Sequence, residues 1–178
     1  RPDDTPYSRT KVVNFRQPFL TQRVREIDQV LEYLKQQSTT TTKANGNDHQ
    51  EQALLQRILE AADYQQGVHL LGHSFGGATM VLAKQDDAFA QRHPIQSLTV
   101  LDCWAFSLPD TSLTRGCDHV LSFLSESWLT NPETEQVQEL LRNSSRVASY
   151  YVPKSVHASF SDAAHWFPGW IGHRLSMR

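Results

Sequence analysis

The sequence has only two cysteines, Cys103 and Cys117, among its 178 residues. Two are too few for a disulfide framework, and neither is flanked by the closely spaced ligands of a zinc site. No apolar run approaches the roughly 20 residues that cross a bilayer. A basic excess is also lacking, since 17 Lys and Arg stand against 19 Asp and Glu. We therefore expect two free thiols, no transmembrane segment, no metal and no nucleic-acid partner.

The first residues, RPDDTPYSRT, lack an initiating methionine, an apolar signal core and the composition of a transit peptide. This start is expected of a processed chain or of a fragment of a longer one. Residues 1–178 are enough for a single domain with a sizeable core. The sequence does not indicate a localisation.

Short apolar segments alternate with stretches of helical periodicity along the chain. The apolar segments predict four strands, at 67–72, 95–106, 118–127 and 145–157. The helical stretches are about 18–36, 49–64, 75–85, 131–144 and 159–175, with a polar loop at 38–48 between the first two. Strands that alternate with helices predict an α/β fold with a parallel sheet.

The stretch GVHLLGHSFGGATM places Ser74 in a Gly-x-Ser-x-Gly motif between a strand and a helix. In such an elbow the serine occupies a strained turn, and we expect Gly72 and Gly76 to remove side chains that would collide. The backbone N–H of Phe75, at the start of the helix, is in a position to stabilise an oxyanion. The motif therefore predicts Ser74 as a nucleophile.

A serine nucleophile needs a base, and the base needs a carboxylate that orients it. Among the eight histidines, His157 alone follows a strand and precedes the last helix. Two carboxylates end strands, Asp102 and Glu126, and position alone does not choose between them. His73 lies within the elbow, where its side chain points away from that of Ser74, and is expected to line or support the pocket. The order of serine, acid and histidine along the chain is that of an α/β-hydrolase.

Four segments, GHSFGGAT, LDCWAFSL, VLSFLSESW and KSVHASFSD, resemble the platelet-activating-factor acetylhydrolases, of the lipoprotein-associated or group VII phospholipase A2 type. The resemblance covers roughly residues 18–178 in order. It implies an α/β-hydrolase fold with Ser74 as nucleophile, Asp102 as acid and His157 as base. The implied reaction is calcium-independent hydrolysis of a short or oxidised sn-2 acyl group from a glycerophospholipid, without a cofactor. The substrate is then a phospholipid at a lipid or lipoprotein surface.

Members of that family carry several strands before the elbow, including the one whose loop supplies a second oxyanion donor. Here about 70 residues precede Ser74, and they predict a loop and two helices. We therefore expect the C-terminal part of an acetylhydrolase-like protein. The alternatives are another carboxylesterase or lipase of this fold, or an inactive segment that packs against another chain. Trp104 and Phe106 are candidates for the acyl pocket, as well as for ordinary core packing.

Overall fold

The computed structural model describes residues 8–39, 53–54, 57, 61–62 and 66–161. Within them, four parallel strands form one sheet in the order β1-β2-β3-β4. The strands are β1 (Val68–His73), β2 (Ile95–Leu101), β3 (Asp118–Ser125) and β4 (Ser145–Val152). The predicted α/β arrangement with a parallel sheet is confirmed.

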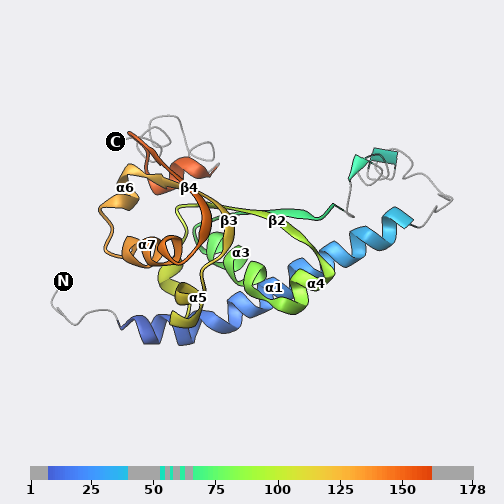
Figure 1. The fold of residues 1–178 in the computed structure, drawn as a ribbon, viewed down its shortest axis with the longest axis horizontal. Helices are drawn as coiled ribbons and strands as arrows, with labels where there is room; N and C mark the ends of the chain where they lie inside the picture. The colour runs from blue at the N-terminus through green and yellow to red at the C-terminus, as the bar shows by residue number, and fades with distance from the viewer. Residues whose placement is uncertain (1–7, 40–52, 55–56, 58–60, 63–65, 162–178) are drawn as a thin grey trace, which may run out of the picture.

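The helices that connect the strands lie on one side of this sheet (Figure 1). Successive right-handed crossovers that always step in the same direction place their helices on the same face. The connections contain α3 (Phe75–Gln85), α4 (Asp87–Arg92), η1 (Ala105–Ser107), α5 (Asp110–Arg115), α6 (Glu126–Leu129) and α7 (Thr134–Arg142). A long N-terminal helix, α1 (Arg9–Thr39), packs against α3 from below, and η2 (His157–Phe160) follows β4.

The core lies between the sheet and these helices. Leu98 and Val100 of β2 are fully buried, as are Leu20 of α1 and Val137 of α7. The strands thus bury alternate residues against the helices, as a period of two requires. Small residues let α3 approach closely: a Cβ placed on Gly77 would lie 3.2 Å from Cys103.

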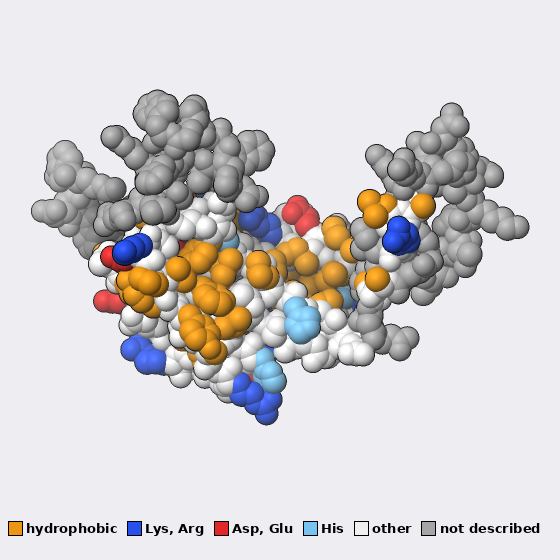
Figure 2. All heavy atoms as spheres, turned by 90° about the horizontal axis from the view of Figure 1, so that it is seen from above, with side chains coloured by type: hydrophobic (Ala, Val, Ile, Leu, Met, Phe, Trp, Pro, Cys, Tyr) orange, Lys and Arg blue, Asp and Glu red, His pale blue; other side chains and the backbone are white. Residues whose placement is uncertain are grey.

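The opposite side of the sheet carries a hydrophobic surface (Figure 2). Strand register puts Leu101, Phe123 and Tyr150 on this side, and the rings of Phe123 and Tyr150 stack with centroids 5.6 Å apart. Leu71 of β1 is 63% exposed and Tyr150 of β4 is 56% exposed. Among the described residues, much of this face of the sheet is therefore exposed.

Several predicted boundaries were wrong. α1 begins nine residues before the predicted start at 18 and runs through Pro18. The carbonyl of Ser8 accepts hydrogen bonds from Lys11 N and Val12 N, and the side chain of Val12 is buried. β2 ends at Leu101, one residue before the predicted end at Asp102, and residues 103–106 of the predicted segment are not strand, since the chain turns at Asp102, where φ is 40°. The short helices α4, α5 and α6 were not predicted.

β4 ends at Val152, before Pro153, and does not run to His157 as predicted. Proline lacks the N–H that a ladder needs, so it ends the pairing. The predicted loop at 38–48 lies almost wholly outside the described residues, as does most of the helix predicted at 49–64. The helix predicted at 159–175 also lies outside them from residue 162 onwards.

Candidate active site

Ser74 is the single residue between the end of β1 and the start of α3. Its backbone has φ 55° and ψ −121°. This conformation is strained, so any residue other than glycine adopts it at a cost in free energy. Two of its backbone hydrogen bonds reach the neighbouring strand and the turn after it: its N–H donates to Leu101 O at 3.0 Å, and its carbonyl accepts from Trp104 N at 2.9 Å. The neighbouring strand and the turn that follows it therefore maintain the strained conformation of Ser74.

The two elbow glycines differ in their surroundings. A Cβ on Gly72 would lie 2.4 Å from the carbonyl oxygen of Gly76, so the expected steric reason for a glycine is found at this position. A Cβ on Gly76 would meet no described atom within 4 Å. The expectation that Gly76 prevents a collision is not met among the described residues, where its missing side chain would contact nothing.

Asp102 follows β2 directly and is completely buried. Its Oδ1 accepts a hydrogen bond from Ser125 N at 2.7 Å, and its Oδ2 accepts from Ser125 Oγ at 2.5 Å. The same Oδ2 lies 3.2 Å from Nδ1 of His157. A buried carboxylate needs hydrogen-bond donors to replace its lost hydration, and here Ser125 of β3 provides two of them.

His157 is the first residue of η2, five positions beyond the end of β4. Its ring stacks on the indole of Trp128, with centroids 4.5 Å apart and planes 16° apart. With Nδ1 turned toward Asp102, the ring's Nε2 is left for a second partner. The hydroxyl of Ser74 makes no hydrogen bond to His157 within the described part of the chain, a contact that free enzymes often form only with substrate.

His73, the residue before Ser74, lies against His157. The two ring centroids are 4.5 Å apart, and Nε2 of His73 is buried without a hydrogen-bond partner among the described residues. Burial lowers the pKa of His73 below its usual value, and the nearby His157 lowers it further. His73 therefore favours the neutral form, and it brings the elbow into contact with the acid–histidine pair.

The aromatic candidates lie beside the elbow. Phe75 is the first residue of α3, where N–H groups have no partner within the helix. Its ring centroid is 5.8 Å from that of Trp104, whose Nε1 donates to Glu133 Oε2 at 2.6 Å. Phe106 is half-buried in η1 and makes no ring contact with this site among the described residues. The guanidinium of Arg16, which the sequence did not single out, lies over both Phe75 and Trp104.

Apart from Glu126, the sequence also did not single out residues of the turn from β3 into α6. Ser125 bonds Asp102, Ser127 Oγ accepts from the backbone N–H of His157 at 3.1 Å, and Trp128 stacks on the same histidine. Glu126, the rival acid, is exposed and accepts a hydrogen bond from Lys154 N at 2.7 Å. Polar residues at the end of a buried strand were the available signal for this turn.

A comparison with protein-family models matches residues 6–178 to platelet-activating factor acetylhydrolase, isoform II. The chain belongs to this family. No curated protein matches the chain. A platelet-activating factor acetylhydrolase is a hydrolase that acts on lipid esters, and the four-stranded parallel sheet with its flanking helices agrees with the α/β-hydrolase fold. In the described part of this acetylhydrolase-family chain, no helix is both long and apolar enough to cross a membrane.

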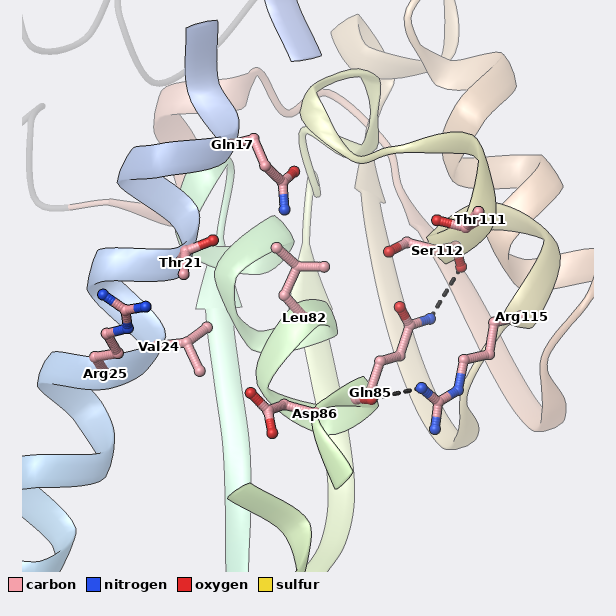
Figure 3. A pocket seen from close by; sticks show the side chains of 10 residues that line it. All are labelled: Gln17, Thr21, Val24, Arg25, Leu82, Gln85, Asp86, Thr111, Ser112 and Arg115. Atoms are coloured by element: carbon pink, nitrogen blue, oxygen red, sulfur yellow. Dashed lines mark hydrogen bonds between the residues drawn. The ribbon is translucent and has the colours of Figure 1, made fainter. Parts of the chain in front are cut away.

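A cavity of about 400 Å³ in this family member lies between α1, the end of α3 and α5 (Figure 3). Its polar groups bond to one another: Gln85 Nε2 donates to Ser112 O at 2.9 Å, and Arg115 donates to Gln85 O at 2.6 Å. None of Ser74, Asp102 and His157 lines it. We interpret this cavity as a packing feature and place the candidate active site at the carboxyl ends of the strands.

Proposed function

We propose that this chain provides the catalytic residues of a serine esterase, with Ser74 as nucleophile, His157 as general base and Asp102 as the orienting acid. The observation that supports this most directly is the buried Asp102 carboxylate, 3.2 Å from Nδ1 of a histidine whose ring lies against the elbow. An aspartate on Nδ1 sets the tautomer whose Nε2 can accept a proton. Ser74, at the strained turn, is the hydroxyl that would give it.

In the proposed reaction, His157 Nε2 takes the proton of Ser74 while the serine oxygen bonds to the ester carbonyl carbon. The carbonyl oxygen becomes an oxyanion that the N–H of Phe75 faces. When the intermediate collapses, the bond to the leaving alcohol breaks and the imidazolium returns its proton to that alcohol. A water molecule then repeats the sequence on the acyl-enzyme and releases the acid.

The substrate that we propose is the short or oxidised sn-2 acyl ester of a glycerophospholipid, such as a 1-alkyl-2-acetylglycerophosphocholine. Membership of the acetylhydrolase family supports an acyl group of this kind. If the preference is correct, the chain should release acetate from such a lipid much faster than oleate from its long-chain counterpart. Equal rates for both would instead favour a general carboxylesterase or lipase.

The experiment that tests this function is labelling of the purified chain with a fluorophosphonate probe, which phosphonylates an activated serine. We expect labelling of wild-type protein, none of Ser74→Ala and strongly reduced labelling of His157→Gln. Circular dichroism of each protein shows whether it is folded. A folded wild-type chain that is not labelled would contradict the proposal for this chain and favour an inactive segment that needs another chain.

A further inference from the structure

The turn from the end of β3 into the start of α6, residues Ser125–Trp128, contacts both members of the acid–histidine pair. We propose that this turn, called here the positioning turn, sets the geometry of Asp102 and His157 relative to each other. The proposal rests on the function proposed above. It assigns no chemical step to the turn, whose residues would act only through the acid and the base.

On the side of the acid, one residue holds both carboxylate oxygens. The backbone N–H of Ser125 donates to Oδ1 of Asp102 at 2.7 Å and its hydroxyl donates to Oδ2 at 2.5 Å. Ser125 and Asp102 are both completely buried, so water does not compete for these bonds. Two donors from one rigid strand end fix the plane of the carboxylate, and with it the direction in which Oδ2 faces His157.

On the side of the base, Ser127 fixes the backbone. Its hydroxyl oxygen accepts from His157 N at 3.1 Å, and its own N–H donates to Ser155 O at 3.3 Å. His157 lies on a segment outside the sheet, so strand pairing does not place it. These two bonds attach that segment to Ser127 of α6. The hydroxyl of Ser127 lies 3.3 Å from that of Ser125, at the end of β3.

Trp128 then fixes the plane of the imidazole. Its indole is 7% exposed and lies nearly parallel to the His157 ring at 4.5 Å. Rotation of the imidazole about its bond to Cβ would break both this stack and the hydrogen bond to Asp102. An aromatic face also attracts a cation, so the stack would favour the imidazolium that forms during the reaction.

The positioning turn is itself held from both sides. The carbonyl of Trp128 accepts from the hydroxyl of Thr134, and Glu126 Oε2 accepts from Lys154 N at 2.7 Å. The carboxylate that competed with Asp102 for the role of acid is thus part of the anchor. A side chain locked by its neighbours can hold a catalytic group to within the small tolerance that catalysis requires.

Ser125→Ala tests the contact with the acid, and Ser122→Ala is its matched control. Ser122 lies on the same strand and is completely buried, but its hydroxyl has no hydrogen-bond partner among the described residues. Loss of one bond to a charged group should lower kcat for p-nitrophenyl acetate about 10- to 100-fold in Ser125→Ala, with KM unchanged. Ser122→Ala should keep the wild-type kcat. Equal kcat in Ser125→Ala and wild type would overturn the proposal.

Trp128→Phe and Trp128→Leu test the contact with the base. Because the indole N–H has no hydrogen-bond partner in the described part of the chain, phenylalanine removes no hydrogen bond and keeps a ring over His157. We expect Trp128→Phe to retain most of kcat and Trp128→Leu to lose it. A Trp128→Phe variant as impaired as Trp128→Leu would contradict a role for the stacked ring.

Nitrogen-15 NMR of the histidine side chains reads the pair without substrate. In wild-type protein and Ser122→Ala, we expect the proton of His157 on Nδ1, and we expect a mixture of tautomers in Ser125→Ala and Trp128→Leu. Unchanged tautomers in both would overturn the proposal. This measurement separates the positioning turn from the proposed esterase function. If fluorophosphonate does not label the folded wild-type chain but Ser125→Ala and Trp128→Leu change the tautomer of His157, the esterase function would be refuted and the positioning turn retained.

Discussion

At the scale of single residues, the two candidate acids, Asp102 and Glu126, have very different surroundings. Asp102 is fully buried and bonded to Ser125 and His157, whereas Glu126, at the end of the next strand, is exposed and bonded to the backbone of Lys154. A buried carboxylate on Nδ1 can select a histidine tautomer, and an exposed one that caps a loop cannot. The contrast makes the proposed acid testable with a single pair of substitutions.

We expect Asp102→Asn to lower kcat by about 10⁴-fold, because the amide favours the wrong tautomer of His157. Glu126→Gln should change kcat by less than about tenfold, because an amide oxygen can still accept from Lys154 N. The measurement is steady-state hydrolysis of p-nitrophenyl acetate by the two variants, with folding checked by circular dichroism. If Glu126→Gln were the more damaging change, the assignment of the acid would be wrong.

At the scale of elements, the junction of β1 and α3 combines strain with close packing. Ser74 has a positive φ, and the chain leaves it directly into a helix whose first turn contains Gly76 and Gly77. Only some of these glycines are required by space: Gly72 faces the backbone of Gly76, while Gly76 itself has no near neighbour. Of the two glycines in the elbow motif, Gly72 is therefore required by space, whereas Gly76 is not required by any described residue.

Gly72→Ala should destabilise the fold by about 1–3 kcal/mol, because its methyl group would collide with a carbonyl and the backbone would have to shift. Gly76→Ala should be neutral or stabilise it by up to about 1 kcal/mol, because alanine favours a helix over glycine. Urea unfolding of both variants and wild type measures the difference. Equal destabilisation by the two substitutions would contradict this account of the elbow.

At the scale of the whole molecule, α1 is attached to the rest of the fold by ion pairs as well as by core packing. Asp28 of α1 accepts two hydrogen bonds from Arg92, at 2.9 Å each, and lies 2.8 Å from Nε2 of the buried His93. The guanidinium of Arg92 is the largest cause that lowers the pKa of Asp28 below its usual 3.8, and His93 adds to it. This carboxylate therefore connects the N-terminal helix to the segment between α4 and β2.

The lowered pKa of Asp28 predicts a pH dependence of stability. A carboxylate whose pKa is lower in the folded state stabilises that state above its unfolded pKa, and the contribution is lost as the pH falls through the folded value. Wild type should thus exceed Asp28→Asn in free energy of unfolding near pH 7, and the gap should narrow as the pH falls below about 4. Urea titrations from pH 3 to 7 measure it.

Asp87→Asn is the control for Asp28→Asn, because its ion pair with Arg115 is exposed on both sides. Exposed pairs contribute about 0–1 kcal/mol, so the gap between Asp87→Asn and wild type should stay small at every pH. A gap for Asp28→Asn that does not narrow at all between pH 7 and pH 3 would show that Asp28 stabilises the fold through packing and not through its charge.

The sequence by itself determined the alternation of strands and helices, and hence the parallel sheet, because periodicity and turn residues are local properties. It also located the elbow, since the Gly-x-Ser-x-Gly motif around Ser74 and the strand and helix on either side of it are neighbours in the chain. Predicted boundaries failed where tertiary contacts override local preference: α1 passes through Pro18 because its N-terminal turn packs on the core. Catalytic roles for the elbow and its partners stay predictions.

Only the tertiary structure decided which groups meet at the candidate site. Asp102 and His157 are 55 positions apart, and their contact depends on the order of β2, β3 and β4 across the sheet. The only sequence signal of the positioning turn is its polar residues at the end of a buried strand, and the roles of its serines and tryptophan follow from what they contact. Hydrogen bonds between side chains on separate strands follow from register and burial, which are set by the packing of the whole chain.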